Sequence, residues 1–117
     1  MKTVVFDFDG VIHSYSSGWQ GMEICNDPPV DGINDAIQAI RKAGYKVVVV
    51  STRCAERSGK NAVSEYLARH DIEVDEVSGT KPPAIVYIDD RAICFDGNPG
   101  TLLRQIEDFK PWNKKGT

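Results

Sequence analysis

Short apolar runs alternate along this chain with stretches in which apolar residues recur every three or four positions. The apolar runs are rich in β-branched and aromatic residues, a composition typical of buried strands. The strands predicted in this way are one that begins at Val4, three over 46–50, 72–77 and 84–88, and a short fifth over 93–95. The helices predicted from the periodic stretches span 31–44, 56–69 and 102–109. This alternation indicates an α/β fold with a parallel sheet and helices on both of its faces.

Residue types at the ends of the periodic stretches refine the helices. Asp31 is a frequent N-cap residue and Gly44 a frequent C-terminal stop, so both ends of the first helix are marked. Gly59 lowers the helical propensity of the first half of the second helix. The first helix is therefore predicted more sharply than the second.

Polar side chains follow four of the predicted strands, at the point where each strand ends. They are Asp7 and Asp9 after the first strand, Ser51, Thr52 and Arg53 after the second, Lys81 after the third, and Asp89 and Asp90 after the fourth. In parallel sheets, ligands bind beyond the carboxyl ends of the strands. We therefore expect these side chains to meet in one site.

The first of these clusters already points to phosphate or metal chemistry. Asp7 and Asp9 are two residues apart, so in an extended chain they project to the same side. Two carboxylates this close are unfavourable unless a cation lies between them or one keeps its proton. Gly10 lets the backbone turn tightly directly after the pair.

Taken together, the strand ends suit a reaction at a phosphate group. Hard oxygen ligands from Asp7 and a later aspartate favour Mg²⁺, and the clusters contain no histidine or cysteine that would favour zinc. A carboxylate can act as the nucleophile and form an aspartyl-phosphate, while the second carboxylate moves the proton. Lys81 and Arg53 would balance the charge on the phosphoryl oxygens.

The composition limits the function further. The chain has 117 residues, 41% hydrophobic and 26% charged, which suits one soluble domain over 1–117. A net charge of -3 predicts no extended nucleic-acid surface, and no apolar run reaches the roughly 20 residues of a membrane span. The three cysteines form no C-x-x-C pair and the N-terminus lacks a signal-peptide pattern, so we expect a reduced, cytoplasmic protein. His13 and His70 are expected at the surface or at a helix end rather than as ligands.

Two segments fall outside the predicted elements. Residues 13–30 form a long loop that contains Trp19, and loops of this length in a small domain are often functional. Residues 110–117 form a polar tail that is expected to fray, apart from Trp112.

The order of the motifs resembles the haloacid dehalogenase superfamily of phosphatases. The resemblance rests on Asp-Phe-Asp-Gly-Val, a Ser-Thr-Arg after a strand, a lone lysine and Ile-Asp-Asp, and it covers Thr3 to about Asp96. It implies a Rossmann-like sheet with the strand order 5-4-1-2-3. The Ser-Thr-Arg segment is similar to the Ser-Gly-Arg of polynucleotide-end phosphatases.

The resemblance also implies roles for the acids and the lysine. Asp7 matches the nucleophile, and Asp9 matches the general acid/base that also binds Mg²⁺ through its backbone carbonyl. Lys81 matches the lysine that stabilises the phosphate. Asp89 and Asp90 match the acids that bind the metal, and which of them contacts the ion stays open.

The phosphate-binding hydroxyl is implied less sharply. Ser51 matches it when Arg53 is aligned with the arginine of the Ser-Gly-Arg version. Thr52 then stands where that version has glycine, so Ser51 and Thr52 are both candidates for binding phosphate.

The spacing of the motifs leaves no room for the cap domain with which many members of the superfamily select their substrates. Only the loop 13–30 follows the first motif, and the segment before Lys81 is shorter still. A capless member commonly acts on large or exposed phosphates, or borrows a neighbouring subunit as a lid. The sequence thus predicts a Mg²⁺-dependent phosphomonoester hydrolase for a nucleotide, a nucleic-acid end or another exposed phosphate, and leaves a homo-oligomer open.

Other functions use similar residues. A phosphotransferase of the same superfamily would use the same nucleophile, and a scaffold would keep the site without turnover. A receiver-like phospho-acceptor domain also groups aspartates, a hydroxyl and a lysine around Mg²⁺, but it carries its acceptor aspartate after the third strand. In this chain the second acid pair follows the strand after Lys81, so the order favours a hydrolase.

Overall fold

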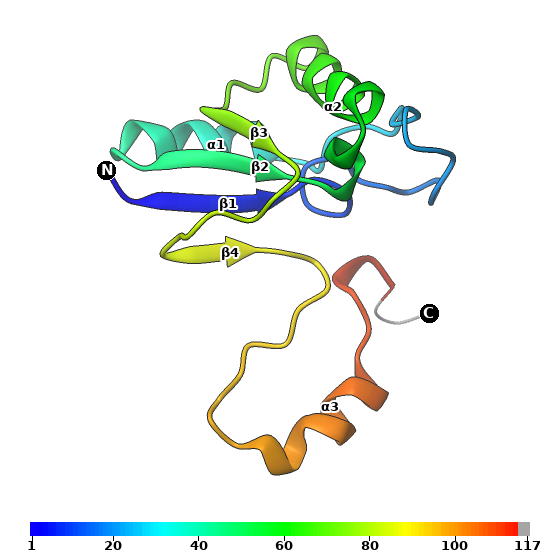
Figure 1. Cartoon of the computed structure of the whole chain (residues 1–117), viewed down its shortest axis with the longest axis vertical. Helices are drawn as coiled ribbons and strands as arrows, with labels where there is room; N and C mark the ends of the chain where they lie inside the picture. The colour runs from blue at the N-terminus through cyan, green and yellow to red at the C-terminus, as the bar shows by residue number, and fades with distance from the viewer. Residues whose placement is uncertain (115–117) are drawn as a thin grey trace.

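The computed structural model describes residues 1–114 and contains a four-stranded sheet, three α-helices and three short 3₁₀ turns (Figure 1). The strands are β1 (Thr3–Asp7), β2 (Lys46–Val50), β3 (Glu76–Ser78) and β4 (Val86–Ile88). The α-helices are α1 (Ile33–Lys42), α2 (Arg57–Arg69) and α3 (Leu102–Asp108). The 3₁₀ turns are η1 (Thr52–Ala55), η2 (Pro99–Thr101) and η3 (Trp112–Lys114).

The sheet is parallel throughout and has the order β3-β2-β1-β4. Phe6 in β1 lies opposite Val49 in β2 and Ile88 in β4, so the three strands end at one edge. The predicted parallel α/β fold is confirmed, as is the 4-1-2-3 part of the predicted strand order.

The predicted fifth strand over 93–95 is wrong, because this segment forms no strand in the structure. The run contains only three residues, and the chain leaves the sheet after β4, so its backbone meets no neighbouring strand to pair with. β4 therefore stays at the edge of the sheet, with Val86 and Tyr87 partly exposed.

The core lies between one face of the sheet and the two helices α1 and α2. Side chains alternate between the faces of a strand, so Phe6 of β1 and Val49 of β2 point to the same side. They pack in one cluster with Ile37 of α1 and Tyr66 of α2, which places both helices on this face.

The other face of the sheet carries the buried side chains of Val5 and Val48. The connection from β3 to β4, residues 79–85, crosses this face (Figure 1). A helix was expected on each face, but this connection is short and contains Pro82 and Pro83, which prevent helical hydrogen bonding. Among the described residues, the second face is therefore crossed by a loop.

Some element ends differ from the prediction. The N-cap of α1 is Gly32, which adopts a left-handed conformation with φ 79°, and not Asp31. The third strand begins at Glu76 instead of Ile72, because pairing with β2 starts only opposite Val48. These shifts leave every predicted helix in place.

The chain after β4 forms an arm that lies apart from the sheet (Figure 1). Its helix α3 exposes the apolar side chains of Leu103 and Ile106. The arm returns to the body at Trp112, whose indole Nε1 donates a 2.7 Å hydrogen bond to the Gly10 carbonyl. Residues 115–117 of the predicted tail lie outside the described residues.

Within residues 1–114, no helix has the length and apolar character needed to cross a membrane.

Candidate functional site

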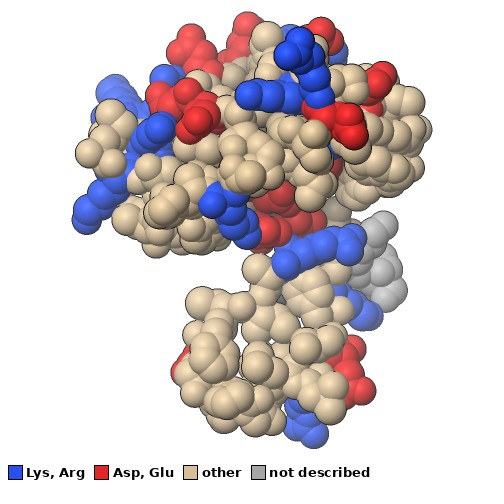
Figure 2. Space-filling model, in the orientation of Figure 1, with Lys and Arg blue, Asp and Glu red and all other residues tan. Residues whose placement is uncertain are grey.

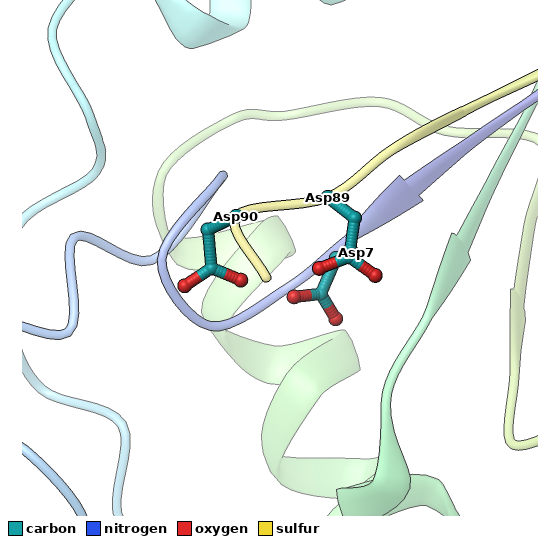
Figure 3. A group of neighbouring side chains, drawn as sticks. All are labelled: Asp7, Asp89 and Asp90. Carbon is teal, nitrogen blue, oxygen red and sulfur yellow. The ribbon is translucent and has the colours of Figure 1, made fainter. Parts of the chain in front are cut away.

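Three carboxylates from two strand ends meet at the carboxyl edge of the sheet. Asp7 ends β1, and Asp89 and Asp90 follow β4 (Figure 3). One oxygen of each lies within 4.8 Å of the others. Figure 2 shows carboxylates gathered where the body of the protein meets the arm, with basic side chains on both sides. The structure thus brings Asp7 of the first predicted acid cluster together with both acids of the second.

A tight turn after β1 makes this meeting possible. The Phe8 carbonyl accepts the backbone N–H groups of Val11, Ile12 and His13, so the chain reverses directly after the strand. Gly10 in this turn has φ 85°, in the left-handed region that glycine adopts without strain. A Cβ at this position would overlap the Asp90 carboxylate. Gly10 is therefore required both for the turn and for the approach of Asp90.

The three carboxylates lie close together, and the pKa of Asp7 is shifted in these surroundings. Burial raises the pKa of Asp7 to about 8, helped by a hydrogen bond with Asp90 and by the negative charge of Asp89. A positive charge among the three carboxylates would favour the ionised form of Asp7 and lower this pKa. A set made only of carboxylate oxygens suits a hard divalent cation, and these residues therefore fit Mg²⁺.

The predicted lysine and hydroxyl groups lie around this cluster. Lys81 Nζ is 3.9 Å from Asp89 Oδ2 and also lies over the Tyr87 ring. Ser51 is only 4% exposed, and its Oγ caps η1 by accepting the backbone N–H of Arg53. Thr52, the first residue of η1, is exposed.

Asp9 does not join the carboxylate cluster through its side chain. Its Oδ1 accepts hydrogen bonds from His13 Nδ1 (2.8 Å) and Arg53 Nη2 (3.2 Å), and its Oδ2 accepts one from Arg53 Nε (2.9 Å). Burial alone would raise the pKa of the Asp9 carboxyl, but these hydrogen bonds and the charge of Arg53 hold it below its usual value. Asp7 and Asp9 are therefore placed in opposite electrostatic surroundings, although they are two residues apart.

Arg53 is fully buried and binds other parts of the protein. Besides Asp9, its Nη1 donates to the carbonyls of Gly21 (2.8 Å) and Met22 (2.9 Å) in the loop. The guanidinium carbon lies 4.7 Å from the centroid of the Trp19 ring. The contact between Arg53 and phosphate stays a prediction, and this placement gives Arg53 a structural role beneath the site.

His13 was expected at the surface, and this expectation is wrong. The side chain is buried, 1% exposed, and stacks on Phe8. Its Nε2 accepts the backbone N–H of Asp27, so Nδ1 carries the proton that is donated to Asp9. The signal in the sequence is weak: His13 directly follows the apolar pair Val11–Ile12, close to the acids.

Glycine is needed at position 59 for a structural reason, although it lowers the helical propensity of α2. A Cβ at this position would overlap the backbone carbonyl of Arg53. The glycine therefore lets α2 pack against η1, the turn that positions Arg53 beneath the site.

A cavity of about 280 Å³ opens beside these groups. Its lining residues are Asp7, Asp9, Tyr15, Trp19, Ser51, Thr52, Asp90 and Arg91. The predicted site residues in this lining are Asp7, Asp9, Ser51, Thr52 and Asp90. The lining does not include the other three, Arg53, Lys81 and Asp89. Tyr15 and Arg91 were not predicted, because a lone residue in a loop carries no periodicity or motif that would single it out.

Comparison with known proteins finds similarity at the level of structure. No protein-family model matches the sequence, and no curated protein matches it significantly. A conserved protein from Bacteroides thetaiotaomicron has a TM-score of 0.62 and 17% identity, over 99% of this chain and 98% of that one. A Vibrio cholerae protein has a TM-score of 0.54 and 21% identity, over 92% of this chain and 98% of that one.

A third similar structure is a chain of the Pnkp1/Rnl/Hen1 RNA repair complex. Its TM-score is 0.53 at 16% identity, over 94% of this chain and 33% of that one. The chain therefore shares its fold with these three proteins. It spans about a third of the length of the chain from the RNA repair complex. In the fold observed here, the acids lie at the carboxyl ends of β1 and β4.

The buried ion pair of Arg53 and Asp9 should contribute more to the free energy of unfolding than a surface ion pair does. Arg53→Leu removes the guanidinium donors from two loop carbonyls and leaves the Asp9 carboxylate with His13 as its remaining side-chain donor. We expect a loss of about 3 kcal/mol in the free energy of unfolding. Arg41→Leu is the matched control, because Arg41 pairs with Glu73 and Asp75 at the surface and should matter much less. Urea unfolding of the three proteins tests this, and equal losses would contradict it.

The raised pKa of Asp7 predicts a particular pH dependence. Between the unfolded pKa of 3.8 and the folded pKa of about 8, the folded protein holds a proton that the unfolded chain releases. The metal-free protein should therefore lose stability as pH rises through this window, and Asp7→Asn should remove this component. Added Mg²⁺ should raise the melting temperature more at pH 8 than at pH 5, because the proton competes with the cation. Thermal unfolding measures both effects, and an unchanged slope in Asp7→Asn would contradict the assignment.

Proposed function

We propose that the protein is a Mg²⁺-dependent phosphomonoester hydrolase that works through an aspartyl-phosphate on Asp7. The observation that carries this proposal is the shared cavity, which is lined by Asp7, a second acid, Asp9, and the hydroxyl-bearing residues Ser51 and Thr52. Two further carboxylates, Asp89 and Asp90, lie against Asp7. The residues proposed as nucleophile, proton carrier and phosphate donors thus line one opening, which supports the proposal.

The first step is attack of an Asp7 carboxylate oxygen on phosphorus. A bond forms between this oxygen and phosphorus, the bond from phosphorus to the substrate oxygen breaks, and Asp9 supplies the proton that the leaving oxygen takes. In the second step Asp9 accepts a proton from water, whose oxygen attacks phosphorus and releases phosphate from Asp7. The lowered pKa of Asp9 favours this second, basic role.

Charge balance comes from residues around the cavity. Asp7, Asp89 and Asp90 would hold Mg²⁺, together with the backbone carbonyl of Asp9 that the family resemblance implies. When bound, the ion supplies positive charge that screens the acidic rim from the phosphate. Lys81, beside Asp89, is the proposed cation for the phosphoryl oxygens.

The proposed phosphate donor among the hydroxyls is Ser51. Its Oγ accepts the backbone N–H of Arg53, an arrangement that fixes the oxygen at the start of η1 and leaves the hydroxyl hydrogen to donate. Thr52 lines the same cavity and is the alternative donor.

The proposed substrate class is an exposed phosphate on a nucleotide or a nucleic-acid end. A chain with a similar fold belongs to an RNA repair complex, which supports a phosphate of this kind. The cavity lies beside the exposed side chains of Trp19 and Thr52, which supports access by a large substrate. A cytoplasmic location, the lack of an extended nucleic-acid surface and a homo-oligomer remain proposals from the sequence.

The alternatives of a phosphotransferase and a non-catalytic Mg²⁺-binding scaffold use the same carboxylates. A phosphotransferase would pass the phosphoryl group from Asp7 to an alcohol, and a scaffold would not form the covalent intermediate. Supplying alcohol acceptors while measuring free phosphate separates the first from a hydrolase, because transfer diverts phosphate from water.

Asp7→Asn tests the proposed function directly. Without the nucleophilic oxygen, phosphate release from an aryl phosphate in the presence of Mg²⁺ should fall by about a thousandfold or more. Asp35→Asn, in the first turn of α1, is the matched control and should leave release unchanged. Release by the wild type should also require Mg²⁺. Release that survives in Asp7→Asn would show that another group is the nucleophile.

A further inference from the structure

The cavity at the carboxylates has an aromatic side that the proposed chemistry does not use. Trp19 and Tyr15 line it together with Asp7 and Asp90. Phosphoryl transfer needs positive charge, hydroxyl groups and acids; the Trp19 indole supplies none of these, and the proposed chemistry does not use the Tyr15 hydroxyl. Their position therefore concerns the rest of the substrate, which extends away from the phosphate.

We propose that Trp19, assisted by Tyr15, is the stacking platform for a nucleobase, so that the enzyme selects phosphorylated nucleotides over phosphates without a base. This inference rests on the proposed function and identifies its substrate class. The phosphate lies at Asp7 and the base lies on the indole ring. A free nucleotide and the end of a strand both carry this base, and the experiment below distinguishes them.

The Trp19 ring is exposed but held from below. Its side chain is 56% exposed, and the Arg53 guanidinium lies over one region of the ring, 4.7 Å from the centroid. Arg53 is itself buried and fixed by Asp9. A cation at this distance attracts the π-system and orients it. One part of the indole is thus anchored to the site, while more than half of the side chain stays open to a ligand.

The loop that carries Trp19 is fastened on both sides of it. Before Trp19, the backbone N–H and Oγ–H of Ser17 donate to Asp27, at 2.8 and 2.6 Å. After Trp19, the Gly21 and Met22 carbonyls accept from Arg53. A platform fixed before binding loses little conformational entropy when the ligand arrives, which favours affinity.

Tyr15 and Arg91 complete this side of the cavity. Tyr15 adopts a left-handed backbone conformation with φ 61°, which is uncommon for a residue with a side chain, and its ring contacts the buried ring of His13 edge-on. Arg91 adds a positive charge at the rim. Both residues line the same cavity as Trp19 and the carboxylates of Asp7 and Asp90.

A nucleobase matches these features better than the ring of a sugar does. Every base has a flat face, so an exposed indole binds it without side chains that read particular hydroxyl groups. The remaining polar groups that line the cavity are the acids and hydroxyls proposed for phosphate chemistry, together with Arg91. A sugar phosphate would need several donors and acceptors for its hydroxyl groups, and beyond the proposed phosphate machinery this lining offers chiefly the Tyr15 hydroxyl and Arg91.

Steady-state kinetics with Mg²⁺ test the proposal. The substrates are thymidine 5′-phosphate, thymidine 3′-phosphate, short oligonucleotides phosphorylated at either end, and ribose 5-phosphate as the phosphate without a base. We expect kcat/KM to be at least about tenfold higher for the best substrate with a base than for ribose 5-phosphate. Whether mononucleotides or oligonucleotides give the higher value identifies the source of the base.

Trp19→Ala separates stacking from chemistry. It should lower kcat/KM for that best substrate by about fivefold to a hundredfold, mainly through KM, and leave ribose 5-phosphate unchanged. Trp19→Phe should restore most of the loss, because phenylalanine keeps an aromatic face. Phe95→Ala is the matched control: Phe95 is 58% exposed and is not among the residues that line the cavity, so its removal should change neither substrate.

The outcomes separate this inference from the proposed function. Equal activity on ribose 5-phosphate and on substrates with a base, or equal effects of Trp19→Ala on both, overturns the stacking platform while the hydrolase stands. If no substrate releases phosphate, the hydrolase fails, and the platform is tested by calorimetric binding of thymidine 5′-phosphate to the wild type with Mg²⁺. Binding that Trp19→Ala weakens at least about fivefold supports the platform, and absent or unweakened binding overturns it.

Discussion

The buried ion pair between Arg53 and Asp9 is the interaction on which the rest of the site depends. Burying a charged guanidinium is costly unless its donors are satisfied, and here Asp9 and two loop carbonyls accept from it. The same side chain therefore fixes the proposed acid/base, fastens the loop before α1 and supports the Trp19 ring. Gly59 allows this arrangement, since any larger residue would displace the backbone of Arg53.

The two aspartates of the first motif differ because of this pair. Asp9 accepts hydrogen bonds from His13 and Arg53, which lower its pKa. Burial raises the pKa of Asp7 to about 8, and the two further carboxylates beside it add to this rise. Separation of this kind is what a reaction with one nucleophile and one proton carrier needs. It also makes the proposed nucleophile depend on a cation at neutral pH, because added positive charge lowers the pKa of Asp7 and lets all three acids ionise together.

In the proposed function, the residues around the cavity divide between those that would act on the phosphate and those that would face the rest of the substrate. The acids and hydroxyls come from the ends of strands, which the sheet holds rigidly. Trp19 and Tyr15 come from the loop before α1, whose position depends on side-chain hydrogen bonds. A scaffold of this kind can keep its chemistry while the loop changes its specificity.

The sequence by itself determined the parallel sheet, its helices and the meeting of Asp7 with Asp89 and Asp90, because these follow from local periodicity and from the common end of parallel strands. Only the tertiary structure decided that Arg53 is buried under Asp9 and that His13 is part of the same network. It also decided that residues 93–95 leave the sheet and that Trp19 lies at the cavity. These features depend on contacts between residues far apart in the chain, and no local pattern of apolar and polar positions records such contacts.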